Sequence, residues 1–154
     1  MDNALNKSLI KATGEILQSM AGADVSCKPP IEKTIRDTTS ETSVIITFVG
    51  SISGAITLKC SKKLASMIAS QMLGMDVEEG SDDMKDAIGE LLNMIVGTAK
   101  AHYSSDADPF KISIPTTIVG EDYTVHIKAD PNDTISLLDF RCNGDTMGIE
   151  VYLQ

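Results

Sequence analysis

The 154-residue chain is long enough for one hydrophobic core but not for two, so we expect a single domain over residues 1–154. Its 13 basic and 22 acidic side chains give a formal net charge of −9, which would repel a phosphate backbone or an anionic lipid surface and excludes nucleic acid as an expected partner. No apolar run approaches the ~20 residues that cross a bilayer and no signal peptide is visible, so we expect no membrane insertion and a cytoplasmic location.

The first half of the chain predicts one helix followed by strands. Apolar residues recur at helical spacing over Asn3–Ala21, and Gly22 stands where a helix end commonly needs a left-handed residue. The Pro-Pro pair within Val25–Thr34 excludes a central strand there but allows an edge strand or an extended connection. Ser43–Val49 and Gly54–Cys60 are typical of two strands joined in a hairpin.

The second half predicts two more helices and then strands. Ser61 can cap a helix that runs to Gly74, and a longer helix is expected at 83–103, after an acidic linker. Turn-forming residues separate the three strand candidates that follow, which are Thr116–Ala129, Thr134–Cys142 and Met147–Leu153. Helices and strands mix without strict alternation, which predicts an α+β fold with an antiparallel sheet packed against long helices.

The two main predicted helices resemble each other. Residues 12–18 (ATGEILQ) line up with residues 87–93 (AIGELLN), so that each helix carries Gly-Glu followed three positions later by a carboxamide. Each helix is also followed, after a break, by strand candidates. We therefore predict that the chain is a duplicated helix-plus-strands unit.

A polar stripe runs along the second of these helices. At about 100° per residue, Asp86, Glu90 and Asn93 fall within one narrow sector, opposite a strongly apolar side. Gly97 follows in the same sector one turn later. A glycine in a helix interior costs roughly 1 kcal/mol relative to alanine, so Gly89 and Gly97 beside this pair predict that a partner approaches the face closely.

The stripe offers a carboxylate and a carboxamide but no nucleophile. The sequence has no supportable Ser-His-Asp arrangement, no HExxH, no P-loop and no GxGxxG. The acidic run 78–83 lacks the ligand spacing of an EF-hand, and the three cysteines contain no CxxC pair. We therefore expect no cofactor and no metal bound by this chain, and a partner that supplies the reactive centre.

The spacing Asp86-x3-Glu90-x2-Asn93 resembles the D-x3-E-x2-N motif of the CheC, FliY and CheX group of chemotaxis phosphatases. The length, the order of elements and the duplication resemble CheX in particular, and the resemblance covers essentially the whole chain. It implies a protein phosphatase that hydrolyses the aspartyl phosphate of a CheY-like receiver domain, whose own site holds Mg²⁺. It also implies a homodimer formed with sheet contributions from both subunits.

The resemblance also implies a role for each residue of the stripe. Asn93 would orient the attacking water in line with phosphorus, and Glu90 would pair with the active-site lysine of the receiver. This division of labour is reasonable because phosphoryl transfer needs positioning and charge stabilisation more than covalent chemistry. Asp86, Gly89 and Gly97 would belong to the partner-binding surface.

The first helix departs from the motif. Gln18 stands where a second asparagine is expected, and Lys11 stands at the position that corresponds to Asp86. We therefore expect Glu15 and Gln18 to be a relic of the duplication. A glutamine positions water in the unrelated CheZ phosphatases, so a weak second site is the alternative.

Two other interpretations stay open at this point. The rival function is a non-catalytic adaptor that uses the same stripe to bind a receiver domain or a flagellar switch component. The methionines Met67, Met72 and Met75 are interpreted as core-filling residues, with a plastic contact surface as the alternative.

Overall fold

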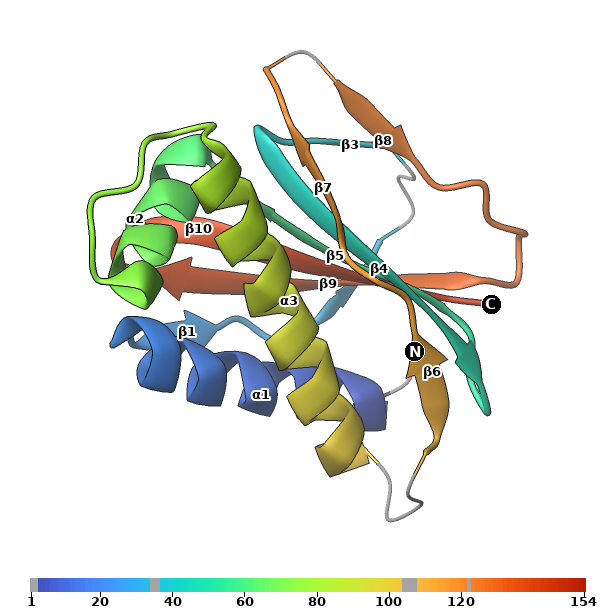
Figure 1. The fold of residues 1–154 in the computed structure, drawn as a ribbon. Helices are drawn as coiled ribbons and strands as arrows, with labels where there is room; N and C mark the ends of the chain where they lie inside the picture. The colour runs from blue at the N-terminus through green and yellow to red at the C-terminus, as the bar shows by residue number, and fades with distance from the viewer. Residues whose placement is uncertain (1–2, 34–36, 104–107, 122) are drawn as a thin grey trace.

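The computed structural model describes residues 3–33, 37–103, 108–121 and 123–154. Within these residues, three helices cover one face of an eight-stranded antiparallel sheet, and a two-stranded ribbon lies beside it (Figure 1). The predicted α+β fold with an antiparallel sheet is therefore confirmed. None of the described helices is both long and apolar enough to span a membrane.

The helix ends follow the expected capping chemistry. The helices are α1 (Asn3–Ala21), α2 (Lys62–Leu73) and α3 (Asp82–Tyr103). Gly22 and Gly74 end α1 and α2 with positive φ angles of 59° and 65°, which glycine adopts without steric cost. Ser61 Oγ accepts the Leu64 N–H at 3.0 Å, so the predicted N-cap of α2 is confirmed.

The main sheet takes strands from both halves of the chain. Its strands are β1 (Val25–Cys27), β2 (Ile31–Glu32), β4 (Thr42–Gly50), β5 (Gly54–Cys60), β6 (Phe110–Ile112), β7 (Thr116–Val119), β9 (Thr134–Cys142) and β10 (Asp145–Leu153). Their order is β1-β9-β10-β5-β4-β6, with β2 beside β9 and β7 beside β4. The separate ribbon pairs β3 (Asp37–Thr39) with β8 (Thr124–His126).

This strand order carries the predicted duplication. The hairpin β4-β5 corresponds to the hairpin β9-β10, and the shorter strands β1, β2 and β3 correspond to β6, β7 and β8. If each strand is exchanged for its counterpart, the list of strand pairs stays the same. The two hairpins meet at the centre of the sheet, where β5 pairs with β10. Helices α1 and α3 lead the two units, and among the described residues α2 has no counterpart. The duplication is thus confirmed at the level of topology.

The predicted strand Thr116–Ala129 is wrong in one respect. The structure divides it into β7, which pairs with β4, and β8, which pairs with β3 outside the main sheet. Gly120 ends β7, and its N–H donates to the Glu41 carbonyl at 3.0 Å. Continuous β-propensity predicts extended backbone but cannot show that the chain leaves one sheet for another. The strands β3 and β6 were not predicted, because three residues are too few to show alternation.

The packing of α3 on the sheet defines the core. Ile88, Leu91 and Leu92 of α3 have no exposed surface, and they belong to one buried cluster with Val44 of β4 and Leu58 of β5. The predicted apolar side of α3 is therefore confirmed as the side that packs inward.

A buried carboxylate forms two ion pairs on the face of the sheet that points away from the helices. Glu150 alternates along β10 with the core residues Ile149 and Val151, so it points away from the helices and is only 2% exposed. It forms ion pairs with Lys33, just after β2, and with Lys59 of β5, the second at 2.5 Å. Burial raises the pKa of Glu150, but hydrogen bonds from the two lysines outweigh burial and leave the pKa below its ordinary value.

We predict that Glu150→Gln lowers the free energy of unfolding by about 3 kcal/mol near neutral pH, because two lysines would lose a buried counter-charge. A lowered pKa means that this stabilisation is complete above the ordinary carboxyl value of 4.5 and is lost as pH falls below it. Urea unfolding at about pH 7 and about pH 3 should therefore show a smaller difference between the two proteins in acid.

Asp139→Asn is the matched control for this prediction. Asp139 lies on the neighbouring strand β9 and pairs with Lys28 at 3.1 Å, but the Lys28 side chain is 66% exposed. Its loss should cost less than about 1 kcal/mol. An equal cost for Glu150→Gln at both pH values would contradict the charge argument.

Candidate functional site

The predicted polar stripe lies on the outer side of α3. Asp86, Glu90 and Gly97 are exposed and Asn93 is half-buried. Figure 1 shows α3 crossing in front of the sheet, with α1 and α2 on one side of it and β7 on the other. The buried side of the helix fixes the backbone, so the stripe is held on a rigid element.

The polar groups of the stripe are free of internal partners. In the described part of the chain, no hydrogen bond or ion pair involves the side chain of Asp86, Glu90 or Asn93. The neighbouring Lys85 instead pairs with Asp82 at 3.5 Å. Glu90 and Asn93 can therefore both be used by a group from outside the chain.

The two glycines near the stripe have different surroundings. Gly89 is buried, and a Cβ added there would lie 3.2 Å from Thr117 Oγ1 and 3.7 Å from Pro115 Cγ. The close approach expected from a partner is thus made by β7 and the residue before it, which corrects the prediction that Gly89 belongs to the partner-binding surface. A Cβ at Gly97 would meet no atom within 4 Å, so only Gly97 leaves open space on the outer face.

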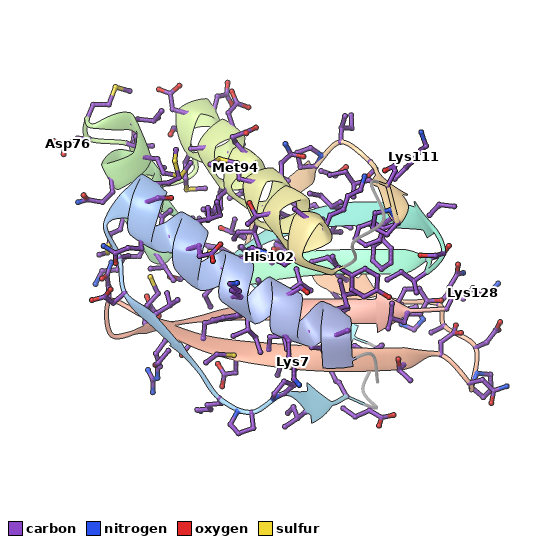
Figure 2. The ribbon with its side chains drawn as sticks, turned by 90° about the horizontal axis from the view of Figure 1, so that it is seen from below. Lys7, Asp76, Met94, His102, Lys111 and Lys128 are labelled. Carbon is purple, nitrogen blue, oxygen red and sulfur yellow. The ribbon has the colours of Figure 1, made fainter. Side chains whose placement is uncertain are left out.

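The corresponding surface of α1 has an internal partner. Lys11, Glu15 and Gln18 are exposed along α1. His102, in the last turn of α3, places Nε2 3.1 Å from Glu15 Oε2, so an N–H on that nitrogen donates to the carboxylate. Figure 2 shows α1 lying along α3 in the region of His102. The Glu15 carboxylate is therefore already held, in contrast to Glu90.

A groove lies beside the stripe that sequence analysis did not predict. It has a volume of about 340 Å³ and is lined by Met20, Met72, Leu73, Asp83, Asp86, Ala87 and Glu90. Met67 and Met75 are 40% and 51% exposed, so the core-filling interpretation is wrong for these two, whereas Met72 is half-buried and packs against the core. The sequence did contain a sign of this groove, because the segment 62–75 has more large apolar residues than one face of a short helix can bury.

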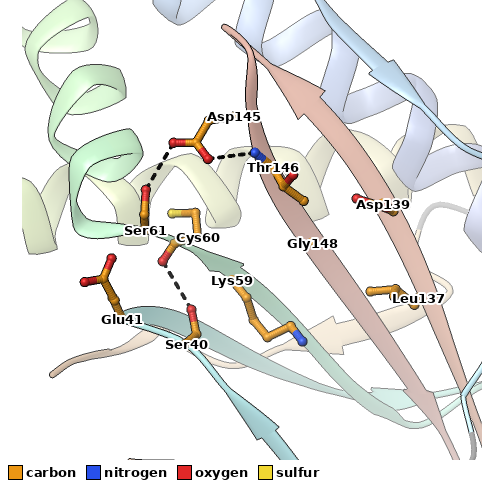
Figure 3. A pocket seen from close by; sticks show the side chains of 10 residues that line it. All are labelled: Ser40, Glu41, Lys59, Cys60, Ser61, Leu137, Asp139, Asp145, Thr146 and Gly148. Carbon is orange, nitrogen blue, oxygen red and sulfur yellow. Dashed lines mark hydrogen bonds between the residues drawn. The ribbon is translucent and has the colours of Figure 1, made fainter. Parts of the chain in front are cut away.

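A second hollow, of about 470 Å³, lies over the end of β5, the middle of β9 and the start of β10 (Figure 3). Two of its acidic groups contact the start of α2: Glu41 Oε1 accepts the Lys62 N–H at 3.2 Å, and Ser61 Oγ donates to Asp145 at 3.3 Å. The third, Asp139, pairs with Lys28. Burial raises the pKa of the Cys60 thiol to about 12, which removes it as a nucleophile near neutral pH. These residues stabilise the fold and include none of the stripe.

The family of the chain is decided by its central region. The model of the family described as chemotaxis phosphatase CheX matches residues 42–136, which is more than half of the chain. The chain belongs to the CheX family. The matched residues include all of α3 and its stripe, whereas α1 with Glu15 and Gln18 lies outside them. No curated protein matches the chain significantly.

Solved structures agree with this assignment to the CheX family. The chemotaxis protein CheX of Desulfovibrio desulfuricans is 28% identical, with a TM-score of 0.87 over 97% of this chain and 99% of that one. CheX of Vibrio vulnificus, at 21% identity, gives 0.85 over 97% and 99%. CheX of Borrelia burgdorferi, solved in complex with CheY, BeF3 and Mg²⁺, is 19% identical and gives 0.78 over 97% of both chains. The last two show the shared fold.

The surroundings of the two glycines lead to a prediction that separates them. Gly97→Ala should raise the free energy of unfolding by about 0.5–1 kcal/mol, because alanine is the better helix former and the space is open. Gly89→Ala gains the same propensity but must displace Thr117, so we expect a smaller gain or a net loss. Urea unfolding measures both, and equal stabilisation would contradict the packing role of Gly89.

Proposed function

We propose that this CheX-family protein hydrolyses the aspartyl phosphate of a CheY-like receiver domain, with Asn93 orienting the attacking water and Glu90 contacting the lysine of the receiver. The observation that carries the proposal is the pair Glu90 and Asn93, one turn apart on a firmly packed helix and without any internal partner in the described chain. The family description and the Borrelia CheX–CheY complex support the choice of substrate.

The chemistry of the two side chains suits this reaction. Water attacks phosphorus and the aspartyl oxygen leaves, which yields a free aspartate on the receiver and inorganic phosphate. The Asn93 carboxamide can accept a hydrogen bond from the water through its C=O and donate one to a phosphoryl oxygen through its NH₂. It cannot act as a strong base at neutral pH, so its contribution is positioning. The receiver brings its own Mg²⁺ as part of the substrate.

Glu90 and Asp86 would hold the receiver in register. A carboxylate at position 90 attracts a lysine ammonium. Because Glu90 lies one turn before Asn93, this contact would fix where the receiver lies relative to the Asn93 carboxamide. Asp86 lies a further turn back and would contact the receiver outside its phosphorylation site. The proposal includes a homodimer with sheet contributions from both subunits, and a cytoplasmic location with the receiver.

The α1 surface is proposed to be inactive. Gln18 has one more methylene than asparagine, so its carboxamide would lie farther from the helix than that of Asn93. The neighbouring Glu15 is held by His102 and lacks the freedom of Glu90. Lys11 would also repel a basic partner at the position where Asp86 attracts one.

We predict that Asn93→Ala lowers the turnover of a phosphorylated cognate receiver by at least about 10²-fold, as expected for the loss of one preorganised group. Binding of the receiver should be largely retained, because the carboxylates of the surface remain. The measurement is the decay of the phosphorylated receiver in Mg²⁺, with receiver binding measured separately.

Gln18→Ala is the matched control, and it should dephosphorylate the receiver at the wild-type rate. A loss of activity in Gln18→Ala would instead establish α1 as a working second site. If the wild-type protein binds several cognate receivers without accelerating their decay, the phosphatase proposal fails and the adaptor function replaces it.

A further inference from the structure

The groove beside the stripe, here called the methionine groove, has an apolar floor that the chain leaves uncovered. Its floor is formed by Met20 of α1, Met72 and Leu73 of α2 and Ala87 of α3. Met20 is 37% exposed and Leu73 is 48% exposed. Large apolar side chains that are exposed together in one hollow are typical of an interaction site. Three helices converge here, so the shape of the groove is set by the fold.

The rim of the methionine groove is acidic and uncompensated. Asp83, Asp86 and Glu90 line it, and no lysine, arginine or histidine does. Among the described residues, none of these three carboxylates takes part in an ion pair, whereas Asp82, one residue earlier, pairs with Lys85. An apolar floor with an unpaired acidic rim suits a segment that carries an apolar side chain next to a basic one.

We propose that the methionine groove is the docking site for the receiver, and that it takes an apolar side chain flanked by lysine or arginine from a segment next to the phosphorylated aspartate. This inference rests on the proposed function. Asp86 and Glu90 belong both to the stripe and to the rim, so a receiver engaged by Glu90 lies beside the groove and within reach of its floor. The floor then buries apolar surface that the stripe alone lacks.

The docking site determines affinity and specificity rather than the rate of the chemical step. Contacts on the floor are the same before and during the attack on phosphorus, so they strengthen ground state and transition state equally. Methionine side chains are flexible and polarizable, which lets the floor fit a basic and apolar segment without a fixed shape. The groove therefore predicts effects on KM, whereas Asn93 acts on kcat.

The first experiment replaces floor residues with a polar residue of similar size and helix propensity. Met20→Gln and Leu73→Gln should each raise KM for the phosphorylated receiver roughly five- to tenfold and leave kcat within about twofold. Met67→Gln is the matched control, because Met67 is 40% exposed on the same helix α2 but lines a different hollow. Thermal unfolding of each variant shows whether the fold is intact.

The second experiment tests the rim with neighbouring aspartates. Asp83→Asn should raise KM and weaken its dependence on salt, because one attractive charge is removed from the path of the receiver. Asp82→Asn changes the same charge one residue away, at a side chain that is 96% exposed and paired with Lys85, and should leave KM unchanged.

The outcomes separate this inference from the proposed function. An unchanged KM in Met20→Gln and Leu73→Gln, with turnover still abolished in Asn93→Ala, overturns the groove and leaves the phosphatase intact. If the wild-type protein shows no turnover, binding of the receiver treated with beryllium fluoride and Mg²⁺ decides, and equal affinity of wild type and Met20→Gln overturns the groove. Altered sedimentation of Met20→Gln without altered receiver binding would assign the groove to a second copy of the chain instead.

Discussion

The packing of one face of α3 against the sheet is the constraint on which the rest of the structure depends. Ile88, Leu91 and Ile95 are completely buried, which fixes the rotation of the helix about its axis. At 3.6 residues per turn, the side that carries Glu90 and Asn93 must then face outward. The functional surface is therefore a consequence of the core, and it needs no loop to place it.

The duplicated topology supplies two such helices, but only one keeps its polar stripe free. In α1 the Glu15 carboxylate is held by His102, which lies in the extra length of α3. Helix α2 adds a second difference, because its Met72 and Leu73 form part of the groove floor next to α3, and the described residues of the other unit hold no equivalent helix. A symmetric fold thus presents a single asymmetric surface, with carboxylates, a carboxamide and an apolar groove in one place.

This surface is suited to completing the reaction centre of another protein. Away from this surface, burial keeps the Cys60 thiol protonated, and Glu41 and Asp145 of the second hollow contact the start of α2. In the proposed mechanism Glu90 and Asn93 would act by position, which requires a rigid support and open access. The buried face of α3 gives the first, and the open space at Gly97 gives the second.

The sequence by itself determined the three helices, the ends of the first two at Gly22, Ser61 and Gly74, the two central hairpins, the duplication and the outward sector of Asp86, Glu90 and Asn93. The helices, hairpins and outward sector follow from local periodicity and turn chemistry, which are encoded in neighbouring residues, and the duplication follows from comparing two such segments. Only the tertiary structure decided that β7 packs on Gly89, that β8 leaves the main sheet, that His102 holds Glu15 and that Met20 meets Leu73 in a groove. Each of these depends on two elements far apart in the chain, and a periodic pattern gives the direction of a side chain without showing what lies in that direction.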